Sequence, residues 1–525
     1  MGRPSFVLYI TDQHRADFLG CAGHPVLRTP NIDSLAARGA RYDNFFVASP
    51  VCMPNRASLM TARMPACHGV RMNGVPLSRR NVTFVELLRD AGYKTALIGK
   101  SHLQPFSGKP PGGLPGSPRP GFHQATGSLK EAVRHDLAGP NYGYEDAAFW
   151  ADPDARLPTP YYGFDHVELV TGHGDRLGGD YRRWLLDRAP EADTLIGAQN
   201  QLPHDYICPQ AVRTAVPEAL YSTTYIAERA QAWIAEQAGG DEPFFLMVSF
   251  PDPHHPFNPP GRYWDMYDPD DMPVPASFTA ADWAPPPHVA GVIAARAAGQ
   301  ANLNGMPAIG CSAREAQEAQ ALTCGMISMI DDAIGQVEAA LDQAALAPVR
   351  LFTSDHGDHL GDHGLLFKGA EQYDQITRVP FIWCDPDGEP DGAPRGVQHQ
   401  IGQTIDIGPT ILNRARIEPA WGMQGLPLTQ STTRDAALVQ YAHQKPMDGV
   451  GVAPHVHSLV SARYRLSVFE GLEWGELYDL HADPGELHNL WDAPEAQPAR
   501  AEMTEALLRA ELAHIDRAPY PVARA

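Results

Sequence analysis

Short apolar runs alternate with amphipathic segments along much of the chain, and the apolar runs stop abruptly at polar residues. Four of these runs have the length of buried β-strands and lie at 5–11, 94–98, 243–250 and 349–353. Amphipathic periodicity predicts long helices at 221–238 and 315–346. Strands that alternate with helices in this way predict an α/β fold with a large, mostly parallel central sheet flanked by helices.

Two further helices are predicted from the residues at their ends. Thr29 and Pro30 provide an N-cap and a first helical position, and Gly39 marks the end of that helix. Pro54 suits the first turn of a second helix, which we expect to run to Thr61. Proline is favoured there because the first helical turn leaves its amide groups without helical partners in any case.

Two proline-rich stretches interrupt this pattern. Residues 105–120 contain ten Pro or Gly residues in sixteen, and the composition stays irregular to about residue 217. Residues 258–287 are rich in Pro and Asp. Such composition is typical of loops, so we expect loop-rich insertions at about 104–216 and 258–310.

The sequence changes character beyond about residue 415. Short strands are predicted at 463–470 and 476–480, and a terminal helix is predicted from Pro494 to about Ile515. We therefore expect a large domain, 1–415, followed by a smaller C-terminal α+β subdomain with an antiparallel sheet, 416–525.

Polar residues follow the four predicted strands. Asp12, Lys100, His254 and Asp355 each lie just past the end of one strand, although they are far apart in the sequence. Ligands of open α/β sheets bind at the carboxyl ends of the strands. We therefore expect these four side chains to meet in one site.

The composition excludes some classes of partner. Lys and Arg total 41 against 62 Asp and Glu, which gives a formal net charge of −21, and no Lys/Arg run is present. Such a surface repels phosphate backbones, which argues against nucleic acid, although a few local cations suit a small anion. No apolar run is long enough to span a membrane, and we expect no signal peptide. Seven unpatterned Cys residues fit a reducing compartment, so we expect a cytoplasmic protein.

Cys52 begins the pattern C-x-P-x-R, which ends at Arg56 and is followed by ASLMTAR at 57–63. This pattern resembles the recognition motif of type I sulfatases, members of the alkaline phosphatase superfamily in which the Cys is oxidised after translation to formylglycine. The resemblance implies an alkaline-phosphatase-like fold, a catalytic domain over 1–415 and a formylglycine-generating enzyme as a maturation partner. Arg56 lies one turn along the same helical face and would hold either the nucleophile's alkoxide or a carboxylate behind it.

The resemblance also implies a divalent metal ion. Asp12-Gln13 and Asp355-His356 would supply three oxygens and one nitrogen, and formylglycine made from Cys52 would add another oxygen. The sulfatase pattern often has Asp and Asn where this chain has Gln13 and His356. Carboxylate-rich sites suit Ca²⁺, Mg²⁺ or Mn²⁺, and the imidazole favours Mn²⁺ over Ca²⁺ here.

His359 and His363 follow His356 closely and raise the alternative of a zinc cluster. Glycines at 357, 361 and 364 interrupt this segment and predict a loop. A loop would not align the three imidazoles as a helix would, so we do not expect a zinc site.

Two segments resemble those that bind the anion in sulfatases. Lys100 and His102 lie in IGKSHL, which is similar to the family's G-K-x-H-L segment, so Lys100 would bind a sulfate oxygen and His102 would orient or deprotonate a geminal hydroxyl. Lys368, which precedes Arg378-Val379-Pro380, resembles the family's late lysine and would contact sulfate and the bridging oxygen. Asn73 would reach the anion as a neutral donor.

Residues 253–257 read PHHPF and resemble the family's P-H-x-P segment. A protonated histidine near the bridging oxygen would act as general acid for the leaving alcohol. The register of the segment assigns this role to His254, with His255 as the alternative.

Together these motifs imply hydrolysis of a small anionic sulfate monoester, in the manner of arylsulfatases, through a covalent sulfo-enzyme hemiacetal. The segment TDQHRAD at 11–17 resembles the bacterial branch that holds choline sulfatases, arylsulfatases and phosphonate monoester hydrolases. The phosphonate hydrolases carry Tyr and Thr in place of the Lys100–His102 pair, so we expect a sulfatase with side activity toward phosphonate and phosphate esters. Phosphonate monoester or phosphodiester hydrolysis and choline-sulfatase-like alkyl sulfate hydrolysis are the alternatives. The tail at 517–525 is either a frayed end or an arm that reaches a neighbouring subunit of a homo-oligomer.

Overall fold

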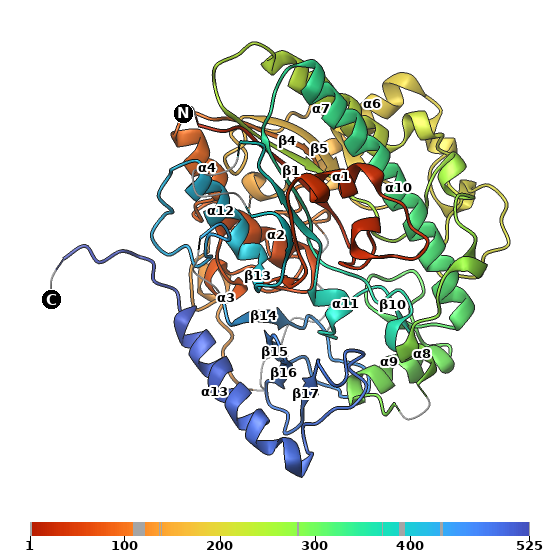
Figure 1. Cartoon of the computed structure of the whole chain (residues 1–525), viewed down its shortest axis with the longest axis vertical. Coiled ribbons are helices and arrows are strands. Elements are labelled where there is room, and N and C mark those ends of the chain that lie inside the picture. The colour runs from red at the N-terminus through yellow and green to blue at the C-terminus, as the bar shows by residue number, and fades with distance from the viewer. Residues whose placement is uncertain are drawn as a thin grey trace.

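The computed structural model describes residues 3–108, 121–135, 137, 139–280, 283–369, 371–387, 394–430 and 434–523. A nine-stranded sheet runs through its centre in the order β12-β2-β11-β9-β1-β7-β4-β5-β6 (Figure 1). Five neighbouring strands run parallel, and these are β9 (Val349–Ser354), β1 (Phe6–Thr11), β7 (Phe244–Ser249), β4 (Lys94–Gly99) and β5 (His166–Thr171). Shorter strands complete the two edges: β2 (Ala40–Tyr42), β6 (Gly178–Gly179), β11 (Phe381–Cys384) and β12 (Gly396–Gln398). The prediction of a large, mostly parallel central sheet is confirmed.

Helices cover both faces of this sheet. One set consists of α1 (Pro30–Arg38), α6 (Asp180–Arg188), α7 (Ser222–Gln237) and α10 (Ala313–Gln343), and the other of α2 (Cys52–Thr61), α4 (Phe84–Asp90) and α12 (Ile407–Arg414). On β1, Val7 and Tyr9 pack into a core with the first set, whereas Leu8 and Ile10 pack into a core with the second. Successive side chains of a strand point to opposite faces, so burial on both faces explains why the strand reads as a continuous apolar run.

A second sheet is formed by the C-terminal part of the chain. Its antiparallel strands are β14 (Ala436–Ala442), β15 (His455–Ser461), β16 (Tyr464–Phe469) and β17 (Gly475–Asp479), and α13 (Gln497–Ala513) packs against them (Figure 1). The predicted C-terminal antiparallel sheet is confirmed, and the domain boundary at 415 stays a prediction. In the described ranges, no helix combines the length and apolar character that crossing a bilayer requires.

The shorter elements connect these layers. They are β3 (Phe45–Phe46), β8 (Ile309–Gly310), β10 (Leu365–Leu366), β13 (Gly402–Gln403), α3 (Pro65–His68), α5 (Ala147–Trp150), α8 (Ala276–Thr279), α9 (Pro287–Ala297) and α11 (Asp374–Thr377). A buried ionic cluster ties α11 to the C-terminal sheet. Arg465 on β16 lies 2.8 Å from Glu476 and also pairs with Glu486, whose other carboxylate oxygen accepts the backbone N–H of Asp374 at 2.8 Å.

The two regions predicted to be loop-rich also contain strands and helices that the sequence did not predict. β5, β6 and α6 lie within 104–216, and α9 lies within 258–310. β5 escaped prediction because His166 and Glu168 interrupt its apolar run. Glu168 is accommodated by an ion pair of 2.6 Å with Arg229 on α7. Residues 109–120 of the proline-rich stretch lie outside the described residues.

The positions of two predicted helix N-termini are confirmed, and one of them is capped differently from expectation. α2 begins at Cys52, two residues before Pro54, because Val51 already has the extended backbone of an N-cap. Thr29 occupies the N-cap of α1, but its hydroxyl makes no capping hydrogen bond. Asp331 on α10 replaces it, since its carboxylate accepts the backbone N–H of Ile32 at 2.8 Å.

Candidate active site

The polar ends of five parallel strands meet at one edge of the central sheet. Asp12 follows β1, Lys100 follows β4, His254 follows β7 and Asp355 follows β9, and these four side chains are fully buried. A fifth residue, His173, follows β5. The strands are parallel neighbours, so their carboxyl ends lie side by side. The structure therefore brings together the four residues selected from the sequence.

Cys52 lies at the centre of these strand ends. It is the first residue of α2 and is buried, with its Sγ 3.1 Å from His356 Nε2 and 3.7 Å from Asp12 Oδ1. Asn55 holds the start of the helix in place, because its amide donates to the carbonyl oxygen of Asp355 at 2.6 Å. Burial, reinforced by Asp12, raises the pKa of the Cys52 thiol to about 11. The encoded side chain is therefore a neutral thiol at pH 7 and a poor nucleophile.

The residues around Cys52 fit a divalent cation. Asp12, Asp355 and His356 each place one ligand atom within 4.8 Å of the others and of Cys52 Sγ. Burial alone would raise the pKa of Asp12, but the positive charges of Lys100, Arg56 and Lys368 together outweigh burial and hold that pKa well below its ordinary value. His356 Nδ1 lies 2.9 Å from the carbonyl oxygen of its neighbour, so Nδ1 carries the proton and Nε2 is left as a ligand. Two carboxylates and one imidazole suit Mn²⁺, Ca²⁺ or Mg²⁺.

Gln13 lies at the edge of the same cluster, on a left-handed backbone with φ of 66°. Its N–H donates to Asp355 Oδ1 at 3.1 Å, and its Oε1 accepts from Lys368 Nζ at 2.7 Å. Its amide nitrogen bonds Asp358 and lies 2.9 Å from His255 Nδ1. Oε1 is therefore the side-chain atom of Gln13 that is suited to a cation, and in this structure the ammonium of Lys368 bonds to it.

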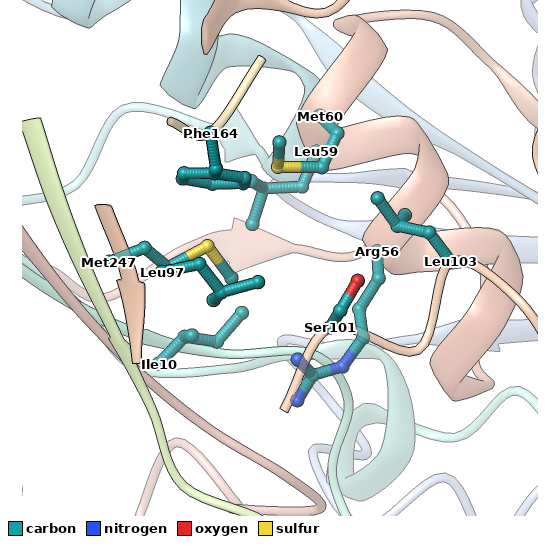
Figure 2. A pocket seen from close by; sticks show the side chains of 9 residues that line it. All are labelled: Ile10, Arg56, Leu59, Met60, Leu97, Ser101, Leu103, Phe164 and Met247. Atoms are coloured by element: carbon teal, nitrogen blue, oxygen red, sulfur yellow. The ribbon is translucent and has the colours of Figure 1, made fainter. Parts of the chain in front are cut away.

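Arg56 lies one helical turn after Cys52 and points to the carboxylate rather than to the thiol. Its Nε is 2.6 Å from Asp355 Oδ2, and its Nη1 donates to the carbonyl oxygen of Lys100 at 3.1 Å and to Ser249 Oγ at 3.0 Å. Figure 2 shows the guanidinium beside a cavity of about 10 Å³ whose lining is mostly apolar and includes Ile10, Leu59, Met60, Leu97, Leu103, Phe164 and Met247. Burial would lower the pKa of Arg56, but Asp355 and Asp12 together outweigh burial and raise it above the ordinary value.

Lys100, His102 and His173 form a second group next to the carboxylates. Lys100 Nζ bonds Asp12 and lies 2.8 Å from His173 Nε2. His102 Nδ1 is buried and has no hydrogen-bond partner within the part of the chain that the structure describes. Glu145 fixes the turn that carries His102, because its carboxylate accepts that residue's N–H at 2.6 Å and the next two N–H groups at 3.0 Å.

Lys368 and His254 form a third group. The Lys368 Nζ is 2.6 Å from His254 Nε2, and His254 Nδ1 bonds the carbonyl oxygen of His255. Nδ1 therefore carries the proton, and Nε2 accepts from the ammonium. Burial lowers the pKa of His254 well below its ordinary value, and His173 and Lys368 lower it further. His254 is thus a neutral imidazole whose charged partner is Lys368, whereas His255 bonds Gln13 instead.

Two other predictions concern residues around this cluster. Asn73 Oδ1 accepts the N–H of Met53 at 3.1 Å, which places its side chain at the N-terminus of α2. His363 lies in a single 3₁₀ turn with φ of 56° rather than on a helix. Among the described residues, the groups able to hold a metal include His356 but neither His359 nor His363.

Sequence reasoning missed His173 and Glu145, which both lie in the region expected to be a loop. His173 stacks on His254 with 3.9 Å between ring centroids and contacts Lys100. His173 could have been selected because it follows β5 as Lys100 follows β4. It was missed because the sequence did not predict β5. Glu145 has no comparable signal because no predicted element precedes it.

Comparison with known proteins identifies the family. A model described as sulfatase matches residues 4–417. The chain belongs to the sulfatase family. A second model, described as N-sulphoglucosamine sulphohydrolase, C-terminal, matches residues 361–513 of this sulfatase.

Individual relatives extend along the whole of this sulfatase. It is 28% identical to the uncharacterized sulfatase YidJ of Escherichia coli over 516 residues, which cover 97% of this chain and 87% of the relative. It is 28% identical to an arylsulfatase of Clostridium perfringens over 504 residues, which cover 94% and 91%. The crystal structure of the phosphonate monoester hydrolase of Agrobacterium radiobacter matches it with a TM-score of 0.75 and 25% identity, covering 98% of this chain and 97% of the other. These matches place the sulfatase in the alkaline phosphatase superfamily.

Proposed function

We propose that this sulfatase hydrolyses sulfate monoesters, with aryl sulfates as the first substrates to test, and that it requires formylglycine at position 52 and one divalent metal ion. The observation that carries the proposal is the position of Cys52, whose Sγ lies 3.1 Å from His356 and 3.7 Å from Asp12 at the start of a buried helix. A nucleophile held beside carboxylate and imidazole ligands, with ammonium groups nearby, suits attack on a tetrahedral anionic ester.

Four side chains would bind the transferred sulfate. Lys100 and Lys368 would each place an ammonium group on a non-bridging oxygen. Asn73 and His102 would add neutral hydrogen bonds. The two ammonium groups are buried, so their charges act in a medium of lower polarity than water and stabilise developing negative charge more strongly.

Formylglycine in place of Cys52 would supply a hydrated aldehyde with two hydroxyl groups. One hydroxyl would attack sulfur and displace the alcohol. Loss of a proton from the other hydroxyl would then expel sulfate and restore the aldehyde. His102 would hold or take that proton. Burial and Lys100 lower the pKa of His102 well below its ordinary value. The imidazole is therefore neutral and free to accept a proton at Nδ1, which has no partner among the described residues.

The metal ion would be held by Asp12, Gln13, Asp355 and His356. When bound, it would act as a Lewis acid that favours an ionised attacking oxygen. Of these candidates we infer Mn²⁺ before Ca²⁺ and Mg²⁺. His356 offers an imidazole where the family pattern often has an Asn carboxamide, and Gln13 offers a neutral amide where the pattern often has an Asp carboxylate. Arg56 would orient Asp355 from behind rather than touch the substrate, since its Nε is 2.6 Å from that carboxylate.

The Lys368–His254 pair would protonate the leaving alcohol. The ammonium of Lys368 carries the proton, and the 2.6 Å contact with His254 Nε2 orients it. Donation of a proton from this hydrogen-bonded pair to the bridging oxygen is what a general acid must supply. Within the described residues His255 makes no hydrogen bond with Lys368, so it is the weaker candidate.

Phosphonate monoester hydrolysis is the second candidate. The observation that favours it is the full-length match to the phosphonate monoester hydrolase of Agrobacterium radiobacter, at a TM-score of 0.75. Phosphonate monoesters and sulfate monoesters both spread one negative charge over non-bridging oxygens, so one set of cations serves both. Lys100 and His102 favour sulfate.

The deciding experiment compares kcat/KM for 4-nitrophenyl sulfate and 4-nitrophenyl phenylphosphonate. Conversion of Cys52 is first checked by intact mass, because the aldehyde is lighter than the thiol by roughly 18 Da. We expect the sulfate to be the better substrate and Cys52→Ala to be inactive on both. Higher kcat/KM for the phosphonate would reverse the preference, and substantial turnover by Cys52→Ala would refute the nucleophile.

A further inference from the structure

We propose that a cavity beside the catalytic cluster receives the alcohol part of the substrate and selects alcohols that carry a second negative charge. This inference rests on the proposed function. The cavity has a volume of about 440 Å³ and lies between α5, the turn that joins β5 to β6, and α6. Small-molecule sites in proteins commonly measure about 300–1,000 Å³, so a single sugar or aromatic ring fits it.

Phe106 connects the cavity to the catalytic cluster. Its ring lines the cavity. The same ring stacks on His102 with 3.9 Å between centroids and an interplanar angle of 7°, and it meets His173 edge-on at 5.6 Å. When the sulfate group lies near His102, the alcohol part of the substrate can therefore extend into this adjoining cavity.

Exposure points to the same side of the cluster. The side chain of His173 is 14% exposed, whereas Cys52, Lys100, His254 and Lys368 are at most 4% exposed. Among these five residues, His173 is the one that solvent reaches. Since Phe106 lies against His173, the part of the substrate that extends out of the cluster passes the cavity.

The walls of the cavity suit a ring. Phe106 and Trp150 present aromatic side chains, and Leu177 and Ile196 add apolar surface. The indole N–H of Trp150 is already bonded to the carbonyl oxygen of Tyr144 at 2.8 Å, so its ring rather than its donor is available. Aromatic faces bind flat rings and the apolar faces of sugars.

The charge in the cavity comes from two arginines with different partners. Arg182 forms an ion pair with Asp193, which neutralises its charge. Arg176 bonds only the amide oxygen of Gln199, and the structure gives it no carboxylate partner in the described ranges. Its guanidinium lies against Gly197, where φ is 88° and an added Cβ would come within 2.6 Å of it.

Arg176 is exposed and lines this cavity, in a chain whose formal net charge is −21. Since it has no carboxylate partner among the described residues, its guanidinium is open to an anionic group of a ligand in the cavity. Guanidinium groups bind carboxylates and sulfates in a two-pronged geometry. The cavity therefore fits a ring-bearing alcohol with a carboxylate or a second sulfate.

The test uses two aryl sulfates that differ in one charge, 4-carboxyphenyl sulfate and its methyl ester. The ratio of their kcat/KM values is measured for the converted wild-type enzyme and for Arg176→Gln. We expect the wild type to favour the carboxylate and Arg176→Gln to lower the ratio about tenfold. Arg509→Gln, which removes an exposed arginine of α13, serves as the matched control and should leave the ratio unchanged.

A ratio unaffected by Arg176→Gln would overturn the charge selection while leaving sulfate hydrolysis intact. If the wild type hydrolyses neither ester, the proposed function fails, and the cavity is then judged by binding alone. Calorimetry with Cys52→Ala would compare 4-hydroxybenzoate with its methyl ester. If 4-hydroxybenzoate binds more tightly than its methyl ester, and Arg176→Gln abolishes that difference, the proposed charge selection by the cavity is supported. Equal binding of the two compounds would overturn it.

Discussion

Arg56 and Asp355 form an ion pair with 2.6 Å between Nε and Oδ2, and neither side chain is more than 1% exposed. The pair joins the first turns of α2 to the end of β9. It therefore fixes Cys52, four residues before Arg56, against a carboxylate that we propose to be a metal ligand. Removal of either partner would leave a buried charge without compensation, which is costly in a protein interior.

Arg56→Leu should lower the free energy of unfolding by about 3–5 kcal/mol, because Asp355 loses its buried partner. Urea unfolding monitored by fluorescence measures this loss. Arg38→Gln is the control, since Arg38 is 49% exposed and its pair with Glu338 spans 3.3 Å. We expect the control to lose less than about 1 kcal/mol, and equal losses in the two variants would contradict a special role for the buried pair.

Metal removal should abolish turnover and lower the melting temperature, because Asp12 and Asp355 would repel each other once the cation is gone. Dialysis against a chelator, followed by addition of Mn²⁺, Ca²⁺ or Mg²⁺, measures both effects. Gln13→Asp adds a negative charge and a harder ligand, so it should shift the relative affinity from Mn²⁺ toward Ca²⁺ by about tenfold. Gln430→Asp, at an exposed position, is the control, and an identical shift in both variants would remove Gln13 from the ligand set.

His173→Gln should lower kcat/KM for aryl sulfates by roughly 10- to 100-fold, because Lys100 loses a neighbour at 2.8 Å and His254 loses a stacking partner. The matched control is His166→Gln, at the start of the strand that precedes His173, where the side chain is 41% exposed. Steady-state kinetics on enzyme with verified conversion at position 52 tests the prediction. Full activity in His173→Gln would show that the imidazole is only a wall of the site.

Asp331 gives the fold a pH dependence that lies outside the active site. Burial raises the pKa of its carboxyl from 3.8 to about 6, so the folded chain binds this proton more tightly than the unfolded chain does. The resulting stabilisation is complete below about pH 4 and is lost as the pH rises through about 6. Relative to Asp331→Asn, which cannot titrate, the wild type should lose about 2–3 kcal/mol across this range. Urea unfolding of both proteins checks this, and a constant difference between them would contradict the raised pKa.

The sequence was sufficient to predict the central strands and the convergence of their polar ends. β1 and β7 are buried on both faces, so each reads as an apolar run that stops at a polar residue. The apolar runs of β4 and β9 are shorter, because Lys94 and Thr95 begin β4 and Arg350 interrupts β9. Topology then places Asp12 and Asp355 together without further information. These features depend on local composition and on one general rule of parallel sheets.

Other features depend on contacts that composition does not encode. β5 was missed because Glu168 is stabilised by Arg229, 61 residues later in the sequence. The same holds for the start of α1, where Asp331 from α10 takes the role expected of Thr29. The proton arrangement of His254 and Lys368 also depends on a contact across 114 residues. Long-range partners of this kind become visible only in three dimensions.

The burial of Cys52 also restricts when it can be oxidised. Its side chain is enclosed by residues that follow strands far along the chain, of which Asp355 and His356 lie within its ligand cluster. About 300 residues separate Cys52 from these neighbours, and ribosomes add roughly 5–20 residues per second. For some 15–60 s, therefore, the motif is present in the growing chain before the walls of its site exist. The conversion of Cys52 to formylglycine that we propose would therefore take place in that interval or on a chain kept unfolded, because the residue is only 1% exposed in the finished fold.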